Sequence, residues 1–496
     1  MKRLRCTLAS VGLLLCLAGA WGEEPVKLPA TPVGQQTQRL LDMLKSGDRE
    51  QIKAFVQENF AAAFLQDIPQ ERHLEANARF ADTTGGVTVQ KILSASETSL
   101  RLVAQAKKTR GMYRVVVEVE AAKPHKITSL GFAPLEPWEQ VQLPPVPEGP
   151  LSHAQIAAWM QDRLERLKQA DGFSGTVLLA HGDQVFFTTA CGLASRAWNQ
   201  PNRLDTKFNL GSMNKMFTSV AIAQLVEKGK VSLDDTIAKH LPDYPNHEAA
   251  QKVTVRHLLG HTSGLADYFN EKFIAASRDR FRTIEDYFPL FADAKLEFEP
   301  GQRFRYSNAG FMVLGAIVQK ASGMNYFDYI REHIYKPAGM VNSDCYELDT
   351  DVPNLAVGYT TRGLGRPSAN TGGKPVVRNN IFMHVIKGGP AGGGYSTVED
   401  LHRFATALRT GKLIRPETLQ QWTTPGEKSP SYGLGFEVYQ ASSPKVIGHG
   451  GGFPGINAAL RVDLDRGYVV AVLSNTDGGT RPVLEKIKEV LAQAKP

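Results

Sequence analysis

The residues with the clearest chemical potential are Ser212 and Lys215, which stand three positions apart. Residues 216–229 read as a helix that is closed by a glycine. Because residues i and i+3 share one helix face, this spacing places the lysine amine beside the serine hydroxyl. A serine hydroxyl becomes an effective nucleophile only when a neighbouring base accepts its proton. The free N–H groups at a helix start also suit a developing oxyanion. The pattern therefore predicts a nucleophile, a candidate base and part of an oxyanion site.

The Ser-x-x-Lys pattern alone also has an ordinary explanation, because it occurs by chance as a solvated pair on helix surfaces. Two further motifs add to it. Tyr306 and Asn308 place a phenol and an amide on one short loop, and the run 449–452, His-Gly-Gly-Gly, follows a strand-like segment. Glycines there would let a ligand lie against a strand edge. Each motif has a structural alternative, a buried tyrosine with a turn asparagine in the first case and a glycine turn in the second.

A chain of 496 residues is long enough for two domains. Residues 37–66 have a helical pattern, and after a polar break come four strand-like runs, 87–93, 99–104, 113–120 and 126–132. We predict a small α+β domain over residues 37–133, of the cystatin-like or nuclear-transport-factor-like kind, with a binding, spacer or regulatory role. The proline-rich residues 134–150 are predicted to be a linker.

The second domain is predicted to span residues 151–496. It begins with an amphipathic helix at 156–168 and a hairpin, and helical and loop sequence fills 212–425. Strand patterns return near the end, at 432–439, 445–449, 456–463 and 468–475, before a last helix at 481–492. Strands at both ends predict one sheet assembled from distant segments. The middle would then form a helical subdomain, with a cleft between the two.

The three motifs, in this order, resemble those of the serine β-lactamase and penicillin-binding-protein superfamily. The likeness is greatest to class C β-lactamases, to D-alanyl-D-alanine carboxypeptidases of the same type, and to esterases on that fold. It covers about residues 151–492, and residues 258–265, 335–340 and 392–401 also match. The resemblance implies a β-lactamase/transpeptidase-like fold of the α+β class, an antiparallel sheet flanked by helices plus a helical subdomain.

The resemblance implies a catalytic role for three residues. Ser212 would be the acylated nucleophile, and Lys215 its proton acceptor or an electrostatic partner. Tyr306 would be the general base for attack and the acid for the leaving group. A phenol ionises near pH 10, so this role needs a neighbouring positive charge, which Lys215 would supply.

The resemblance also implies a substrate-binding set, namely Asn308, His449, Gly450, Gly451 and Gly452. Asn308 would bind a substrate amide or position the catalytic lysine, and the backbone N–H groups of Ser212 and Gly452 would form the oxyanion hole. Well-known members carry Lys-Thr-Gly where this chain has His-Gly-Gly. Since histidine is only partly charged near neutral pH, the change weakens the expectation of a strong preference for carboxylate-bearing penicillins.

A Ser-His-Asp triad is the competing interpretation, with His261 and either Asp267 or Asp235. We do not favour it, because the Gly-x-Ser-x-Gly elbow is absent around Ser212. In the family that this chain resembles, the segment that contains His261 (residues 258–265) forms a structural turn. The glycine-rich residues 388–394 lack the following Lys-Ser/Thr of a phosphate loop and are predicted to be a flexible loop near the cleft.

Residues 1–22 are predicted to be a signal peptide, with a basic start, a short apolar core and small residues before the cleavage site. The apolar run is too short to span a membrane, so a periplasmic or secreted protein is expected without a stable membrane span. A lipid anchor on Cys16 is not expected, because Leu precedes this cysteine where lipoproteins have a small residue. Cys191 and Cys345 remain in the mature chain, and the sequence leaves open whether they pair.

The charge and the residue composition limit the classes of partner that this protein is expected to bind. The formal charge of +7 includes three positive charges of the signal peptide, and no run of Lys or Arg gathers on one face, so nucleic acid is not expected. No Cys/His cluster has metal-ligand spacing, and we expect neither metal nor cofactor.

The sequence thus predicts an exported serine hydrolase that forms an acyl-Ser212 intermediate from an ester, an amide or a D-amino-acid peptide bond. A D-alanyl-D-alanine carboxypeptidase or a β-lactamase proper is the first alternative. A non-catalytic protein that holds a peptide in the same cleft is the second. The natural small-molecule or peptide substrate and the oligomeric state stay open.

Overall fold

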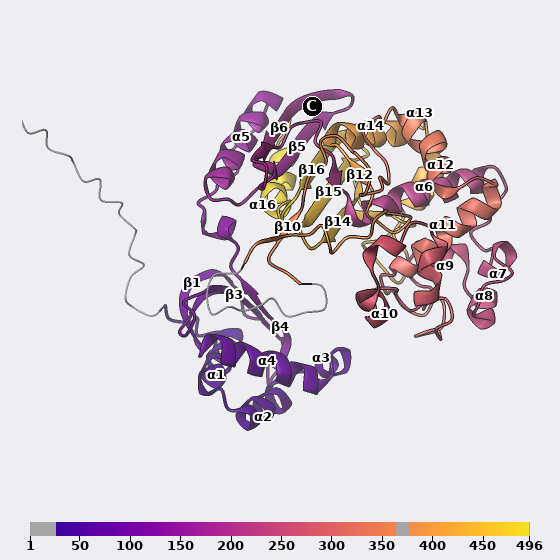
Figure 1. Ribbon diagram of the computed structural model, residues 1–496. Coiled ribbons are helices and arrows are strands. Elements are labelled where there is room, and N and C mark those ends of the chain that lie inside the picture. Colours follow the sequence, from indigo (N-terminus) through magenta and orange to yellow (C-terminus); the bar gives the residue numbers. More distant parts are fainter. Residues whose placement is uncertain (1–25, 364–375, 496) are drawn as a thin grey trace, which may run out of the picture. The chain divides into compact units, whose positions relative to one another are not determined.

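The computed structural model describes residues 26–363 and 376–495, which divide into two compact units at the bond between Glu136 and Pro137 (Figure 1). The expected signal peptide and Cys16 lie outside the described residues. Over the ranges described, no helix is both long enough and apolar enough to cross a bilayer.

The first unit consists of four helices followed by a four-stranded antiparallel sheet. The helices are α1 (Pro32–Ser46), α2 (Arg49–Asn59), α3 (Ala62–Asp67) and α4 (Gln70–Thr84). The strands β1 (Val87–Ala95), β2 (Ser99–Ala106), β3 (Met112–Val119) and β4 (Ile127–Pro134) pair in sequence order. Helix α4 occupies the segment where the sequence indicated only a polar break. It buries just a narrow stripe of its surface, which includes Leu74, Asn77 and Ala81, and so its apolar periodicity is weak.

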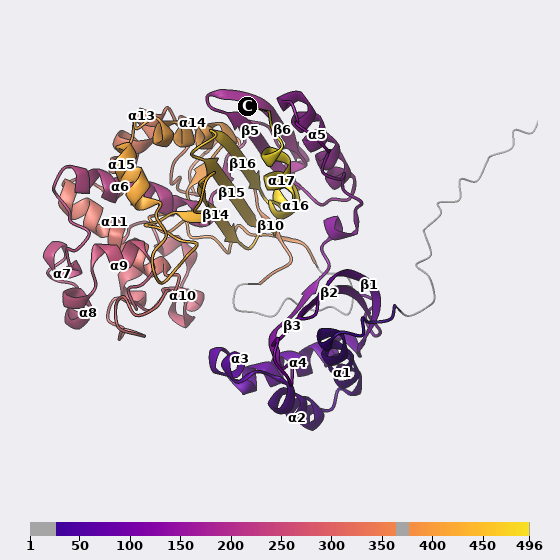
Figure 2. The same ribbon diagram turned by 180° about the vertical axis from the view of Figure 1, so that it is seen from behind.

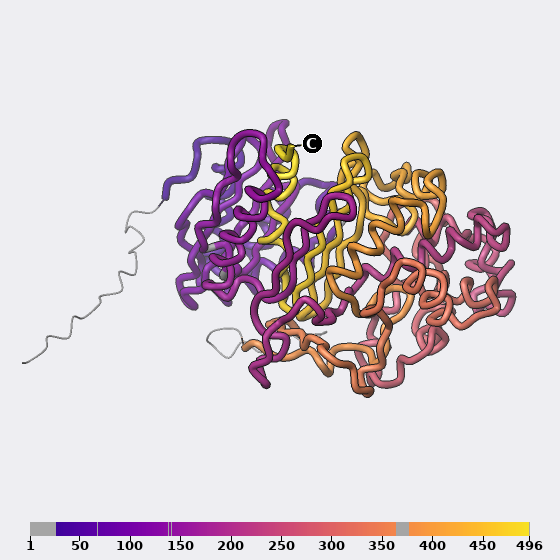
Figure 3. The backbone as a smooth tube through the Cα atoms, turned by 90° about the horizontal axis from the view of Figure 1, so that it is seen from above, coloured from indigo at the N-terminus to yellow at the C-terminus, as the bar shows by residue number. Residues whose placement is uncertain are grey.

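The second unit is built on a six-stranded antiparallel sheet in the order β13-β14-β15-β16-β5-β6. Its strands are β5 (Gly175–His181), β6 (Gln184–Cys191), β13 (Glu437–Gln440), β14 (Val446–Phe453), β15 (Ile456–Asp463) and β16 (Tyr468–Ser474). Strands β5 and β16 come from opposite ends of the domain, and Leu178 pairs with Ala471. Figure 3 shows the two segments side by side. The predicted sheet assembled from distant segments is therefore confirmed.

Helices cover both faces of this sheet (Figures 1 and 2). Successive strand residues point to opposite faces, so Val177 packs toward α5 (His153–Gln169), α16 (Arg481–Leu484) and α17 (Ile487–Ala492). Its neighbour Leu178 belongs instead to the larger core of the helical region. The predicted last helix is divided in two, because Lys486 adopts a left-handed backbone with φ 69°.

The helical region is organised around α6 (Asn214–Glu227), whose residues 214–225 are all buried. Helix α11 (Asn308–Ser322) lies beside it and contacts α9 (Val255–Leu259) in turn, and Phe404 of α14 (Val398–Arg409) packs on Phe217. The shorter helices are α7 (Ile237–His240), α8 (His247–Lys252), α10 (Glu271–Ala275), α12 (Tyr326–Ile330), α13 (Lys336–Ala338) and α15 (Pro416–Trp422). Short strands complete the unit: β7 (Leu193–Ser195), β8 (Gln200–Pro201), β9 (Phe208–Asn209), β10 (Tyr359–Thr360), β11 (Arg378–Asn379) and β12 (Tyr395–Ser396).

Most of the proline-rich stretch that the sequence indicated as a linker, residues 137–150, is part of the second unit. Trp138 is only 8% exposed and belongs to the core beneath α5. The indole N–H of Trp159 in α5 donates to the carbonyl of Pro145 at 2.8 Å. This stretch therefore stabilises the domain that follows it.

We expect Trp138→Ala to destabilise the second unit by about 3–5 kcal/mol, because it leaves a large cavity in a packed core. Trp198→Ala is the matched control, since Trp198 is 84% exposed, and its effect should stay within about 0.5 kcal/mol. Denaturant unfolding followed by circular dichroism measures both. Equal stability of the two variants would show that the proline-rich stretch does not support the domain.

Candidate active site

Ser212 lies on a short 3₁₀ turn, Gly211–Met213, that leads into α6. The turn is fixed from both sides. The side chain of Asn209 accepts a hydrogen bond from the Gly211 N–H at 2.9 Å, and Met213 N–H donates to the Leu210 carbonyl at 3.2 Å. Gly211 has a left-handed backbone with φ 52°, which favours glycine. The hydroxyl is thereby presented at the start of the buried helix.

Lys215 has no exposed surface, and its amine contacts three oxygen atoms. The Nζ atom is 3.3 Å from Ser212 Oγ, 2.8 Å from Asn308 Oδ1 and 2.5 Å from the Ala391 carbonyl oxygen. Burial lowers the pKa of this amine to about 7, although the carboxylates of Asp267 and Glu437 act in the opposite direction. The amine is therefore poised between its charged and neutral forms at neutral pH.

The three partners of Lys215 suit a neutral amine. An uncharged amine has two N–H donors and one lone pair. The oxygen atoms of Asn308 and Ala391 can only accept, and they take the two donors. The lone pair is then left for the hydroxyl of Ser212, which can donate. This arrangement can remove the serine proton directly.

Asn308 is held in place by a carboxylate. Asp267 Oδ2 accepts from the backbone N–H of Asn308 at 2.8 Å and from its side-chain Nδ2 at 3.2 Å. The amide oxygen is consequently turned toward Lys215. The sequence considered Asp267 only as a triad member. Its contact with Asn308 spans 41 positions along the chain, and no local pattern reports it.

Tyr306 lies on the other side of Ser212. Lys215 Nζ is 4.8 Å from the centroid of its ring, and its hydroxyl is hydrogen-bonded to Ser212. Its side chain is 37% exposed because it lines the pocket, yet desolvation, followed by the carboxylates of Glu437 and Asp267, raises its pKa above the ordinary value. The bond to Ser212 acts in the opposite direction without cancelling the shift. Tyr306 is therefore a neutral phenol at pH 7.

Strand β14 carries the glycine motif directly past the nucleophile turn. A methyl group on Gly451 would lie 1.8 Å from the Leu210 carbonyl oxygen, so only glycine permits this approach. Phe453 and Ile456 close a two-residue hairpin. Because ladder pairs alternate, the N–H of Gly452 points away from β15 and toward the turn of Ser212. The two expected oxyanion donors thus share one side of the cleft.

His449 is only 1% exposed and does not line the pocket, and its ring centroid lies 6.4 Å from that of Tyr306. Its Nδ1 lies 2.5 Å from the Gly450 carbonyl oxygen, and its Nε2 lies 2.9 Å from the hydroxyl of Tyr432. The carboxylate of Glu437 is 3.6 Å from Nδ1. Burial lowers the pKa of the imidazole, which Glu437 only partly offsets. His449 is thus neutral at pH 7, and its ring packs beside those of Tyr306 and Tyr432. Tyr432 and Glu437 were not singled out from the sequence.

His261 is also buried and is not bonded to Ser212. Its Nδ1 accepts from the backbone N–H of Ser307 at 3.1 Å, and its carbonyl accepts from Arg305. Burial, together with the charge of Lys215, holds its pKa well below the usual range. The two aspartates of the rejected triad bind elsewhere, Asp267 to Asn308 and Asp235 to Lys239 and His240. His261 therefore acts as a structural turn residue.

The glycine-rich run at residues 388–394 is bound to the nucleophile turn. Leu210 N–H donates to the Gly394 carbonyl at 2.7 Å, and Gly393 N–H donates to the Gly211 carbonyl at 3.2 Å. Asn214 joins the same run through Gly389 and Gly394. The expected flexible loop is instead hydrogen-bonded at both ends, and it supplies the carbonyl of Ala391 to Lys215.

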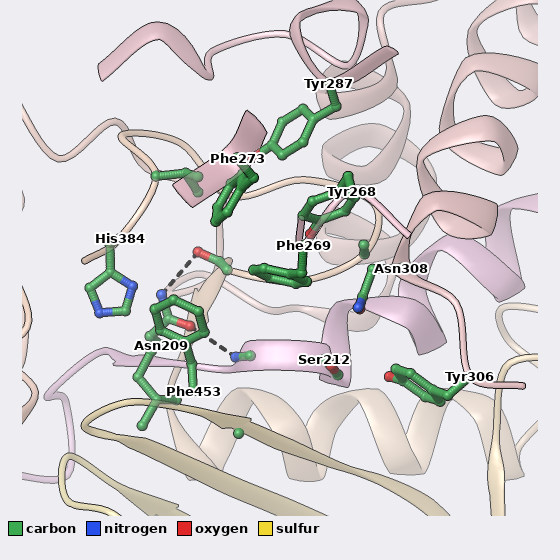
Figure 4. A pocket seen from close by; sticks show the side chains of 17 residues that line it. Asn209, Ser212, Tyr268, Phe269, Phe273, Tyr287, Tyr306, Asn308, His384 and Phe453 are labelled. Carbon is green, nitrogen blue, oxygen red and sulfur yellow. Dashed lines mark hydrogen bonds between the residues drawn. The ribbon is translucent and has the colours of Figure 1, made fainter. Parts of the chain in front are cut away.

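Ser212, Tyr306, Asn308 and Gly452 line one pocket of about 260 Å³ (Figure 4). His449, Gly450 and Gly451 are not among the residues that line this pocket. In the part of the chain that the structure describes, no three His, Cys, Asp or Glu side chains are grouped to hold a metal ion. Cys191 and Cys345 are unpaired thiols.

Comparison with known proteins agrees with this geometry. Residues 160–495 match the family described as Beta-lactamase. The chain belongs to the β-lactamase family. Penicillin-binding protein 4* of Bacillus subtilis is 30% identical over 332 residues, 65% of this chain and 72% of that protein. A penicillin-binding protein structure from Bacillus halodurans matches with a TM-score of 0.60 at 31% identity, covering 67% of this chain and 98% of that one.

Esterase EstB of Burkholderia gladioli is a further relative, 26% identical over 330 residues, which are 60% of this chain and 83% of that protein. The resemblance and the fold expected from the sequence are confirmed. Membership of this β-lactamase family indicates a serine hydrolase.

We expect Gly451→Ala to slow covalent labelling of Ser212 by about a hundredfold or more, because the added methyl displaces the turn that carries an oxyanion donor. Gly450→Ala is the matched control on the same strand, since its methyl would meet its nearest atom, Glu437 Oε1, at an ordinary 3.7 Å. Fluorophosphonate labelling rates measure the difference. Equal rates in the two variants would contradict the close approach of strand and turn.

Proposed function

We propose that this protein is an exported serine hydrolase that forms an acyl-Ser212 intermediate from an ester or amide. The observation that carries the proposal is the amine of Lys215, which is fully buried and has its two acceptors and the serine hydroxyl around it. Export rests on the pattern of residues 1–22.

In the first step, Ser212 Oγ attacks the substrate carbonyl while Lys215 accepts its proton. The negative charge on the carbonyl oxygen is stabilised by the backbone N–H groups of Ser212 and Gly452, each worth about 3 kcal/mol of barrier. Tyr306, a neutral phenol, then gives its proton to the leaving group, and the proton held by Lys215 replaces it. This assigns the base to Lys215, whereas the sequence interpretation left the role open between Lys215 and Tyr306.

In the second step, water attacks the acyl carbonyl and the ester bond to Ser212 breaks. Lys215 again accepts a proton, now from the attacking water. Ser212 Oγ then leaves, and it regains its proton through Lys215 and Tyr306. The atoms balance, since the substrate gains one water molecule overall. No further reactant is needed.

An ester or neutral amide suits this site better than a carboxylate-bearing penicillin. The imidazole that replaces the lysine of Lys-Thr-Gly is buried, does not line the pocket and is neutral at pH 7. EstB shows that the family includes an esterase. A D-alanyl-D-alanine carboxypeptidase and a β-lactamase proper remain the rival assignments, and turnover of each substrate class distinguishes them.

A non-catalytic peptide-binding protein explains the buried lysine less well than an enzyme does. A buried amine costs folding free energy, and a protein that only holds a peptide gains nothing from keeping it beside a serine. The assembly of Ser212, Lys215 and Tyr306 in one cleft favours catalysis instead.

Exposure to a fluorophosphonate should add one probe mass to the wild-type protein and none to Ser212→Ala. Intact-protein mass spectrometry measures this, and with protein taken from the exported fraction it also reports the removal of residues 1–22. A penicillin and a small acyl ester, tested in parallel, should show rapid ester turnover and little penicillin turnover. Equal labelling of Ser212→Ala would exclude this nucleophile, and a mass that retains residues 1–22 would exclude signal cleavage.

The rate constant kcat/KM for a neutral ester should depend on the protonation of Lys215. Because the folded pKa is about 7, the active neutral amine is lost as pH falls, and kcat/KM should drop about tenfold per pH unit below 7 and level off above it. Lys215→Met should lower the plateau value of kcat/KM by about 10²–10⁴-fold and abolish its dependence on pH near 7. A profile that rises only near pH 10 would contradict the assignment.

A further inference from the structure

One side of the pocket is a recess with aromatic walls. Figure 4 shows Phe269, Phe273 and Phe453 on the side of Ser212 opposite Tyr306. The ring of Phe269 lies 4.9 Å from that of Phe273 and 6.1 Å from that of Phe453, centroid to centroid. Tyr268 and Tyr287 extend the same wall. At these distances the rings contact one another, so they form a continuous aromatic wall against which a further ring can pack.

The recess carries no charge at neutral pH. Among the described residues that line it, none is Lys, Arg, Asp or Glu. His384 is the one imidazole in this lining, and desolvation lowers its pKa to about 4, so it is uncharged. Desolvation also raises the pKa of the Tyr268 and Tyr287 hydroxyls, so both phenols stay neutral. A charged ligand group would lose its hydration here without gaining an ionic partner.

Arg278 is the cation that stands behind this wall. Its guanidinium carbon is 4.1 Å from the centroid of the Phe273 ring. The guanidinium donates to the backbone carbonyls of Phe273 and Ala276, and Arg278 does not line the pocket. Its donors are therefore partly occupied, and Phe273 stands between it and the recess.

The recess lies on the acyl side of the scissile bond. Tyr306 faces the leaving group, because it supplies that group's proton, and the recess is on the other side of the nucleophile. The pocket volume is about 260 Å³, and an apolar cavity of about 150 Å³ already holds a benzene ring. A ring and a short spacer to the carbonyl would therefore fit.

We propose that the aromatic recess binds an uncharged aromatic acyl group, so that the substrates are esters or amides of neutral arylalkanoic acids. This inference rests on the proposed hydrolase function and specifies its substrate class. The acyl group would pack against the rings of Phe269 and Phe453 while its carbonyl reaches the two oxyanion donors. The alcohol or amine would leave past Tyr306.

A series of 4-nitrophenyl esters with a common leaving group tests this proposal. We expect kcat/KM for the phenylacetate to exceed that for the acetate by about tenfold or more, since each buried group contributes such a factor. A carboxylate on the ring (the 4-carboxyphenylacetate) should lower kcat/KM by about a hundredfold relative to the phenylacetate, because the recess offers no counter-charge.

Variants locate the preference. Phe269→Ala and Phe453→Ala should each reduce the ratio of the phenylacetate to the acetate rate constant by about fivefold or more. Reading a ratio separates this effect from a general loss of activity. Trp198→Ala removes an exposed aromatic side chain outside the pocket and should leave the ratio unchanged.

Two results would overturn the proposal. Equal rate constants for the phenylacetate and acetate would show that the recess does not select the acyl group. A preference for the carboxylate-bearing ester, lost in Arg278→Ala, would show that Arg278 reaches the ligand and that the substrate is an anion. In both cases fluorophosphonate labelling of Ser212 would persist, whereas failure of labelling would reject the hydrolase function itself.

Discussion

The site depends on the burial of one amine. Lys215 has no exposed surface, and an ammonium group in that position would lose its hydration. The carboxylates of Asp267 and Glu437 compensate for only part of this loss, so its pKa falls to about 7. Catalysis by a serine requires a base that is available at neutral pH, and a solvated lysine does not meet that requirement.

Much of the surrounding structure serves to keep this amine buried and oriented. Helix α6 is buried on all sides over residues 214–225 and lies within the helical region, so it carries Lys215 away from water. The run at 388–394 closes over the nucleophile turn and supplies one acceptor, and Asp267 turns the amide of Asn308 to supply the other. The edge of β14 completes the site by its close approach at Gly451, which allows no side chain.

The sequence predicted the parts of this site that depend on local geometry. The i, i+3 spacing of Ser212 and Lys215 and the period-two pattern of the strands follow from helix and strand geometry alone, and the sheet from both chain ends followed from those strands. The orientation of His449 could not be predicted. It depends on contacts with Tyr432 and Glu437 and on the register in which β13 pairs with β14, and these are tertiary features. The role of Asp267 depends on a tertiary contact, and α4 has too narrow a buried stripe to produce a clear apolar period.

The protonation state of Lys215 is the central claim, and it can be measured directly. Nuclear magnetic resonance of protein labelled with ¹³C at the lysine ε-carbon, with Lys215→Met to assign its signal, follows the amine as the pH is raised. Our account predicts that this signal titrates near pH 7 while exposed lysines titrate near pH 10.4. A Lys215 signal that titrates together with the exposed lysines would contradict the account.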